Sequence, residues 1–286
     1  MSGVADLPVV TVVIPVRDME ATIGGQLAAL ARQDFTDRWQ IVVADNGSSD
    51  GTIAVVEWWQ DYLPLRRVDA SRSADSGYAR NVAVAAAQSE LLAFCDADDE
   101  VGPDWLRVMV SALERNPVVV GRLDHARLNP PKLAATYDQD ECDAPWWGFL
   151  PAGGAGNLGV RRTVFDEIAG FPEGYRRGVD AAFCWRAQLA GYELTLESAA
   201  VVHRRLQALS WWQVFRVHVR DGLGVVRIYQ EFRDLGMPRS PLRDLIYDWA
   251  TVPLWLATGR RYRAARVAGR RVGRLIGSIR SGVLCL

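Results

Sequence analysis

The chain of 286 residues has only four cysteines, and no two of them have the spacing of zinc ligands. Cys95 and Cys184 stand in apolar or aromatic stretches, which favours buried thiols over disulfides and predicts a reduced, cytoplasmic compartment. The N-terminus lacks a basic segment followed by an apolar run, so no secretory signal is expected. The most apolar stretch, 245–257, contains Asp248 and is shorter than the ~18 residues that a membrane span requires.

A large excess of one charge is also missing, because 33 basic and 34 acidic side chains leave a net charge of −1. Residues 259–286 are the exception: they hold eight arginines and no acid, which leaves residues 1–258 at −9. An acidic body with a basic tail argues against nucleic acid as a partner. A composition of 49% hydrophobic and 23% charged residues excludes a disordered chain and a coiled coil.

Short apolar stretches alternate with helical patterns over the first hundred residues. This alternation is typical of βαβ units and predicts an α/β fold with a mainly parallel central sheet. Beyond residue 124 the pattern loosens, and the proline- and glycine-rich segment 129–156 is predicted to be a long functional loop. From residue 210 onward the chain is expected to be helical. Strands are expected at 9–14, 40–44, 65–68, 91–95, 118–120, 157–160, 193–196 and 200–203.

The first expected strand is not followed by a Gly-x-Gly-x-x-Gly turn, and the chain has no P-loop, which argues against dinucleotide and P-loop nucleotide binding. Acidic residues follow three strands instead: Asp18, Asp45, and Asp96 with Asp98. Any one of them alone is typical of a solvated loop. The carboxyl ends of parallel strands share one edge, however, so three together favour a ligand site. Carboxylates can hold a phosphate group there through a divalent cation.

Four segments resemble, in order and spacing, the nucleotide-binding half of family 2 glycosyltransferases with the GT-A fold. They are Val12-Val13-Ile14-Pro15, Asp45-Asn46-Gly47-Ser48-Ser49-Asp50-Gly51-Thr52, Ala79-Arg80-Asn81 and Phe94-Cys95-Asp96-Ala97-Asp98-Asp99. Gly156-Asn157, Gly178-Val179-Asp180 to Arg186, and Ala190-Gly191-Tyr192 resemble the acceptor side of that family. The resemblance implies a GT-A catalytic domain over 1–205, followed by a helical C-terminal region over 206–286 with a basic amphipathic tail.

The resemblance also implies a nucleotide-diphosphate sugar as donor, with UDP or dTDP favoured. Asp98 would bind Mg²⁺ or Mn²⁺ that bridges the diphosphate, and His203 is either a second metal ligand or a structural histidine. Asp99 is expected to cap a helix instead of binding metal. The residues expected to contact the donor nucleotide are Pro15, Val16, Arg17, Asp18, Asp45, Asn46, Arg80, Asp96 and Ala97.

The family usually carries a Glu-Asp pair whose Asp is the general base of an inverting transfer. Here the pair is Val179-Asp180, so the base is present and the Glu is not. Asp180 is therefore either the base or a plain helix cap. Trp146 and Trp147 could form a sugar-stacking platform or pack in a core, and Asn157 is expected near the acceptor.

The tail from residue 259 onward places apolar residues on one helical face and arginines on a neighbouring stripe, as in helices that lie on anionic membranes. Its five glycines leave a frayed, solvated tail as the alternative. The apolar face would include Ala265, Ala268, Val272, Leu275, Ile276, Ile279 and Leu284, beside Arg263, Arg266, Arg270 and Arg274. The expected location is the cytoplasm, including the inner face of the cell membrane; the sequence does not predict an oligomeric state.

The sequence thus predicts a metal-dependent, inverting glycosyltransferase that acts on a hydroxyl of a glycan, a lipid-linked acceptor or a small molecule. A catalytically inactive nucleotide-sugar-binding protein is the alternative, motivated by Val179. A sugar-phosphate nucleotidyltransferase is disfavoured, because its glycine-rich phosphate loop and following lysine are missing.

Overall fold

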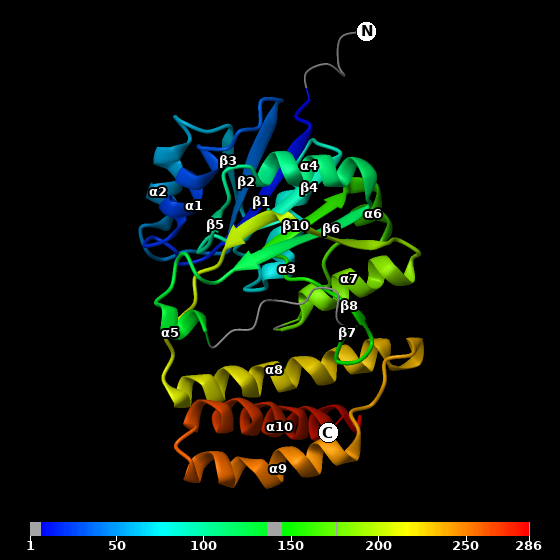
Figure 1. The fold of residues 1–286 in the computed structure, drawn as a ribbon. Coiled ribbons are helices and arrows are strands. Elements are labelled where there is room, and N and C mark those ends of the chain that lie inside the picture. The colour runs from blue at the N-terminus through cyan, green and yellow to red at the C-terminus, as the bar shows by residue number, and fades with distance from the viewer. Residues whose placement is uncertain (1–6, 136–144, 176, 286) are drawn as a thin grey trace. The chain divides into compact units, whose positions relative to one another are not determined.

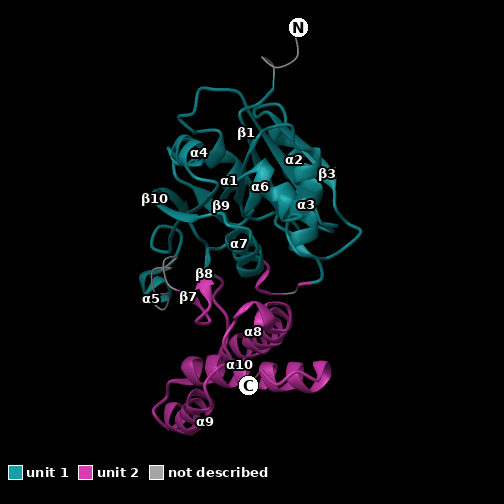
Figure 2. Cartoon of the chain, turned by 90° about the vertical axis from the view of Figure 1, so that its right-hand side faces the viewer, with its two compact units in different colours: residues 1–144, 151–174, 180–206 teal, residues 145–150, 175–179, 207–286 magenta. Residues whose placement is uncertain are grey.

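The computed structural model describes residues 7–135, 145–175 and 177–285, which form two compact units (Figure 2). Unit 1 consists of residues 1–144, 151–174 and 180–206. Unit 2 consists of residues 145–150, 175–179 and 207–286.

An eight-stranded sheet in the described part of the chain forms the centre of unit 1, with strand order β3-β2-β1-β4-β9-β6-β10-β5. β9 pairs antiparallel with β4 and β6, and β5 pairs antiparallel with β10, whereas the other pairs are parallel. Six strands therefore run in one direction, and the predicted mainly parallel α/β sheet is confirmed. The strands are β1 (Val10–Val16), β2 (Trp39–Asp45), β3 (Leu65–Asp69), β4 (Leu91–Cys95), β5 (Glu100–Val101), β6 (Val118–Asp124), β9 (Asn157–Arg161) and β10 (Leu194–His203).

Side chains alternate between the two faces of the sheet and build a core on each. On one face, Val12 and Ile14 of β1 join the buried residues of α1 and α4. On the other face, Phe94 of β4 packs against Phe171 with ring centroids 5.2 Å apart, and Phe171 stacks on Phe183 at 4.3 Å. The helices that lie wholly or mostly in unit 1 are α1 (Ile23–Leu30), α2 (Thr52–Trp59), α3 (Ser76–Ala86), α4 (Trp105–Arg115), α5 (Pro131–Ala134), α6 (Arg162–Glu167) and α7 (Val179–Leu189).

Two segments differ from the expected secondary structure. The strands expected at 193–196 and 200–203 are one strand, β10, whose register against β6 shifts between Glu197 and Val201. A β-bulge of this kind interrupts the alternation of side chains, which is why the sequence looks like two strands. In the expected loop, the structure places α5 and the short paired strands β7 (Pro145–Trp146) and β8 (Leu150–Pro151). Residues 136–144 lie outside the described chain.

The sheet topology decides which loops meet. β1, β2, β4, β6 and β10 run in the same direction, so all five end at one edge of the sheet. β9 is antiparallel and therefore begins at that edge, where it follows Gly156. The loops after β1, β2 and β4, the residues after β10 and the segment before β9 consequently gather at one rim, which is the usual ligand site of open α/β sheets.

Unit 2 is built mainly from helices α8 (Trp211–Phe232), α9 (Leu242–Ala257) and α10 (Arg261–Ser281), with the 3-10 turn Arg233–Leu235 after α8. Within this unit, α10 lies between α8 and α9 (Figure 1). Glycines allow α8 and α10 to approach closely: a β-carbon on Gly273 would lie 2.1 Å from the carbonyl oxygen of Val219, and one on Gly269 would lie 2.6 Å from that of Phe215.

The alternative of a frayed, solvated tail is therefore wrong, because residues 261–281 form helix α10. The glycines of residues 259–286 that were expected to weaken a helix include three that form its contact surface, because Gly269, Gly273 and Gly277 all face α8. Ala265 of the expected apolar face is buried, and only part of that face, including Leu275 and Ile279, is exposed. No helix among the described residues has the length and apolar character needed to cross a bilayer.

Candidate active site

The loops after β1 and β2 are held together by side-chain hydrogen bonds. Asp18 accepts from the backbone N–H of Ser49 at 2.7 Å and from its hydroxyl at 3.0 Å. These bonds from Ser49 lower the pKa of Asp18. The backbone N–H of Asp18 in turn donates to the hydroxyl of Ser48 at 3.1 Å. Of the expected nucleotide contacts before this loop, Val16 is buried in the core and Arg17 is exposed.

Asp45 and Asn46 stand at the end of β2 and are both buried. The Asp45 carboxylate accepts from the backbone N–H of Ser48 at 3.0 Å. Asn46 donates from its amide nitrogen to the carbonyl of Asp75 at 3.2 Å, whereas its amide oxygen has no hydrogen-bond partner among the described residues. A buried hydrogen-bond acceptor without a partner is unusual in a native protein. This one lies in a segment that is expected to bind the sugar nucleotide.

Arg80 is buried beneath the loop that follows β4. Its guanidinium donates from Nη2 to the carboxylate of Asp96 at 2.7 Å and lies over the ring of Phe171, 5.4 Å from the ring centroid. Its Nε has no partner among the described residues. Arg80 is only 5% exposed, so it is not a surface arginine.

The loop 96–99 is braced from several sides. Gln26 donates to the carbonyl of Asp96 at 3.0 Å and accepts from the backbone N–H of Val101 at 3.0 Å. Asp99 accepts from the backbone N–H of Arg205 at 2.8 Å, so it ties two loops together, and the expectation that it caps a helix is wrong. Ala97 is buried.

Asp180 lies in the first turn of α7 and shares the rim with the pair Arg80 and Asp96. It accepts a hydrogen bond from the backbone N–H of Ala155, in the segment that precedes β9. Burial raises the pKa of Asp180; the positive charge of Arg80 opposes this shift, and the negative charge of Asp96 adds to it. The structure therefore brings Asp180 within electrostatic reach of the loop after β4, although 84 positions separate Asp96 from Asp180 in the sequence.

Burial and the neighbouring carboxylates disfavour the ionised forms of Asp98 and Asp99. Burial and then the charge of Asp96 raise the pKa of Asp98, and the same two causes raise the pKa of Asp99 to about 8. The carboxylate of Asp98 accepts from its own backbone N–H, and Arg204 and Arg205 lie near enough to offset part of the rise in its pKa. A cation at this rim would relieve the crowding of like charges.

The carboxylate oxygens at this rim are suitable ligands for a hard divalent cation. No cluster of three His, Cys, Asp or Glu side chains spaced to hold a metal occurs in the described ranges. Mg²⁺, however, is usually held by one or two carboxylates together with phosphate oxygens of the substrate and water. Asp98, a half-buried carboxylate with a raised pKa, supplies an oxygen donor of this type.

His203 has both ring nitrogens engaged. Nδ1 lies 2.6 Å from the carboxylate of Asp124, and Nε2 lies 3.1 Å from a guanidinium nitrogen of Arg127. Because the guanidinium can only donate, Nε2 accepts and the ring proton sits on Nδ1. Of the two alternatives for His203, a metal ligand or a structural histidine, this geometry favours the structural histidine. Metal ligation through Nε2 would require Arg127 to move.

Asn157 does not occupy the expected acceptor position. Its side chain is fully buried, accepts from the indole N–H of Trp105 at 2.8 Å and donates to the carbonyls of Arg122 and Ala200 at 3.0 and 2.8 Å. The amide thus joins β9, β6, β10 and α4. The acceptor expectation for Asn157 is wrong, because a residue that satisfies buried backbone carbonyls is not free to contact a sugar.

Trp146, Trp147 and Val179, which were expected on the acceptor side, belong to unit 2. The rings of Trp146 and Trp147 meet edge to face with centroids 6.1 Å apart, and Trp147 has a φ of 52°. Val179 is buried, and a β-carbon on the preceding Gly178 would lie 2.1 Å from Cδ1 of Ile228. The role of the two tryptophans in acceptor binding remains a prediction.

Two residues of the rim, Gln26 and Arg204, were not predicted from the sequence, and Gly156 was expected on the acceptor side and not beside Asp96. A β-carbon on Gly156 would lie 2.7 Å from Oδ2 of Asp96, so this position is packed against the site. Arg204 lowers the pKa of Asp98, Asp99 and Asp180. A signal existed for Gln26, since it is a polar residue among the buried positions of α1.

The family model for glycosyl transferase family 2 matches residues 11–169, which includes β1, β2, β4 and the loop 96–99. Glycosyltransferase AglE from Haloferax volcanii is 26% identical over 259 residues, which cover 88% of this chain and 81% of AglE. The chain spans about a third of the length of several further curated glycosyltransferases that it matches.

Two solved structures show the fold. Mannosyltransferase PcManGT from Pyrobaculum calidifontis, in complex with GDP-Man and Mn²⁺, matches with a TM-score of 0.67 and 18% identity, over 95% of this chain and 87% of that one. Staphylococcus aureus TarS 1–349, in complex with UDP, matches with a TM-score of 0.58 and 18% identity, over 96% of this chain and 91% of that fragment. With a family match over more than half of its length and a GT-A-like architecture, the chain belongs to glycosyl transferase family 2 and is a glycosyltransferase.

Proposed function

We propose that this protein is a metal-dependent, inverting glycosyltransferase that uses a UDP- or dTDP-sugar and transfers the sugar to a hydroxyl of a glycan, a lipid-linked acceptor or a small molecule. The observation that carries the proposal is the meeting of Asp98, Asp180 and the pair Arg80–Asp96 at one rim of the sheet.

The donor nucleotide is assigned to the loops after β1 and β2. Asp45 and the unsatisfied amide oxygen of Asn46 offer acceptors for the imide and hydroxyl groups of a pyrimidine nucleoside. Asp96, held by Arg80, would face the ribose, and Asp98 would hold Mg²⁺ or Mn²⁺. The metal, when bound, offsets the negative charge that grows on the departing diphosphate.

Asp180 is the base in this proposal. Its carboxylate takes the proton of the acceptor hydroxyl while the hydroxyl oxygen attacks the anomeric carbon and the bond from that carbon to the diphosphate breaks. The products are the glycoside and the nucleoside diphosphate, with the configuration at the anomeric carbon inverted. A buried carboxylate with a raised pKa is suited to the task, because proton transfer is most effective when the base has a pKa near the working pH.

The comparisons support the donor class: PcManGT was solved with GDP-Man and Mn²⁺, and TarS with UDP. The choice between UDP, dTDP and GDP is tested by measuring nucleoside diphosphate affinity by calorimetry, with Mn²⁺ and with a chelator. We expect UDP or dTDP to bind best and chelation to weaken binding at least tenfold.

Asp98→Ala should abolish the metal dependence of binding while it hardly changes the residual affinity in chelator. Asp61→Ala, an exposed carboxylate in the segment after α2, is the matched control and should behave as the wild type. Equal affinity with and without metal in both wild type and Asp98→Ala would overturn the metal assignment. A protein that binds the donor but releases no nucleoside diphosphate with any acceptor would be a binding protein only.

A further inference from the structure

Helix α9 presents an unusually apolar outer surface. Six large apolar side chains of this helix are 44–67% exposed: Leu242, Ile246, Tyr247, Trp249, Leu254 and Leu256. Their neighbours Ala250, Pro253 and Ala257 are exposed as well. Soluble monomers rarely expose a contiguous apolar patch of this kind unless it contacts a partner.

These residues occupy one side of the helix. At about 100° per residue, all nine fall within one half of its circumference, and Arg243 is the single charged residue in that half. The two acids of α9 lie on the other half, where Asp248 accepts from Arg271 of α10 at 2.7 Å and Trp255 is buried against α10. We call the nine residues the outer face of α9.

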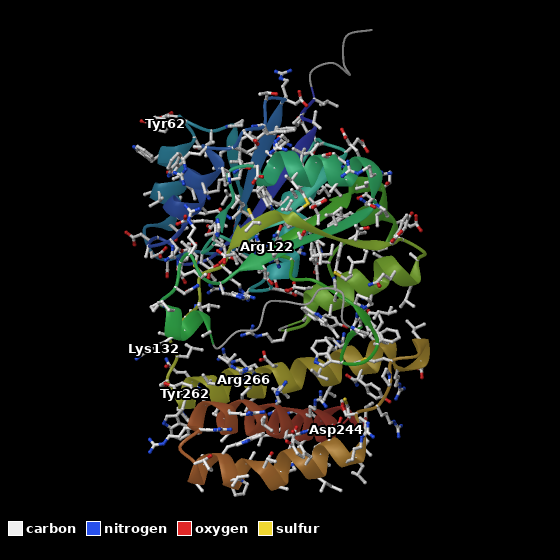
Figure 3. The ribbon with its side chains drawn as sticks, viewed as in Figure 1. Tyr62, Arg122, Lys132, Asp244, Tyr262 and Arg266 are labelled. Atoms are coloured by element: carbon white, nitrogen blue, oxygen red, sulfur yellow. The ribbon has the colours of Figure 1, made fainter. Side chains whose placement is uncertain are left out.

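Arginines flank both ends of this face. Arg260, which precedes α10, and Arg261, its first residue, are exposed, and Tyr262 beside them is 57% exposed. The contacts Arg263–Trp255 and Arg271–Asp248 show that α10 runs antiparallel to α9, so exposed Arg280 lies toward the start of α9. Tyr262 and Asp244 mark the opposite ends of the helix pair (Figure 3). Residues 207–286 contain fourteen arginines against five acids.

We propose that the outer face of α9 docks on the surface of an anionic lipid bilayer. An apolar face enters the boundary between headgroups and acyl chains, and flanking arginines contact lipid phosphates and anionic headgroups. At 16 residues the helix is about 24 Å long, which is too short to span a hydrocarbon core of about 30 Å. The helix therefore lies in the interface.

The charge pattern favours lipid over a second copy of the chain. A two-fold symmetric dimer through this face would bring arginines of both copies together, and the exposed acid at the start of α9, Asp244, already pairs with Arg243 at 3.6 Å. An anionic surface neutralises them instead. The docking element thus differs from the predicted tail: α10 packs between α8 and α9, and α9 makes the contact.

The test is flotation of the full chain with phosphatidylcholine vesicles that contain or lack phosphatidylglycerol. We expect binding to the anionic vesicles that weakens steeply with salt, and little binding to the neutral ones. The variant Ile246→Gln/Leu254→Gln should bind at least ~tenfold more weakly, since it removes two apolar side chains from the face. The matched control, Trp58→Gln/Tyr62→Gln, changes two similarly exposed aromatic residues of unit 1 and should bind as the wild type.

Arg260→Gln/Arg261→Gln tests the charge and should weaken binding to anionic vesicles about tenfold or more. Circular dichroism of each variant checks that its helices are retained. Unchanged vesicle binding by Ile246→Gln/Leu254→Gln would overturn the proposal. The proposal would also be overturned if the wild type did not bind vesicles and formed a dimer in sedimentation equilibrium that Ile246→Gln/Leu254→Gln converts to a monomer. A second copy of the chain would then cover the face.

Discussion

Arg80 lies under Asp96 and donates a 2.7 Å hydrogen bond to its carboxylate. The bond joins a guanidinium side chain that is 6% exposed to a carboxylate side chain that is 37% exposed, at the rim of the sheet. The arginine comes from the middle of α3 and the aspartate from the loop after β4. Because the guanidinium is packed over Phe171, it cannot swing out to solvent without losing that contact. The pair therefore fixes the carboxylate that we assign to the ribose.

Arg80→Ala should lower both stability and donor affinity. The substitution leaves Asp96 without its partner and opens space beside Phe171, for which we expect a loss of about 1–3 kcal/mol in the free energy of unfolding. Urea denaturation measures this loss, and calorimetry with UDP measures affinity. Arg107→Ala is the control, because Arg107 pairs with Asp34 at the exposed surface, where solvent screening leaves such a pair with little effect on stability. Equal losses in both variants would show that the Arg80–Asp96 pair has no special role.

Gly156→Ala should disturb Asp96 directly. The new β-carbon would lie 2.7 Å from Oδ2 of Asp96, so the carboxylate must shift from its position beside Arg80. Overpacking of this kind costs about 1–3 kcal/mol, and we expect a comparable loss in donor binding. Gly154→Ala is the matched control, since nothing lies within 4 Å of its added β-carbon. A Gly156→Ala variant with wild-type donor affinity would mean that Asp96 need not stay in place.

Asp180→Asn tests the base. The amide keeps the size of the side chain and can still accept from the N–H of Ala155, but it cannot take a proton. General-base catalysis contributes about 10²–10⁴-fold, so kcat should fall by that order while donor affinity stays nearly unchanged. Asp166→Asn, on an exposed position of α6, is the control. Turnover of Asp180→Asn within a few-fold of wild type would make Asp180 a structural residue.

Asp99→Asn tests whether the carboxyl group of Asp99 makes stability depend on pH, with metal removed by a chelator. Burial first and the charge of Asp96 second raise the pKa of Asp99 to about 8, against about 3.9 in an unfolded chain. Because the folded protein holds the proton of Asp99 more tightly than the unfolded chain does, protonation stabilises the fold fully at a pH below the unfolded-state pKa. This stabilisation is lost as the pH rises through the folded-state pKa. The wild type should therefore lose stability relative to Asp99→Asn between about pH 4 and 8, on the order of a few kcal/mol. Thermal unfolding of both proteins measures the difference, and parallel curves would contradict the shift.

The local sequence was sufficient for much of the fold. Continuous apolar stretches mark strands that are buried on both faces, and β1, β2, β4 and β9 lie where these stretches predict them. The motif around Asp96 and Asp98 was visible because its chemistry is contiguous in the chain. β10 was misread as two strands, because a bulge breaks the alternation on which the prediction depends.

Contacts between distant segments could not be predicted in the same way. Asn157 has the composition of a polar site residue, and only the crossing of β9, β6, β10 and α4 makes it a buried structural amide. Gln26 and Gly156 lie next to Asp96 although they are 70 and 60 positions away in the sequence, and no local pattern predicts such contacts. The glycines of the tail looked like helix breakers, because their role depends on the partner helix α8.

The sequence by itself determined the fold class, the family and the group of carboxylates at the strand ends, because hydrophobic periodicity and short motifs are written in neighbouring residues. The tertiary structure alone decided which of those residues are free to act. It buried Arg80 beneath Asp96, engaged both nitrogens of His203, and placed α10 inside a helical unit whose exposed apolar face belongs to α9. Burial, pKa shifts and partner choice depend on what lies across space from a side chain, and that is set only when the chain has folded.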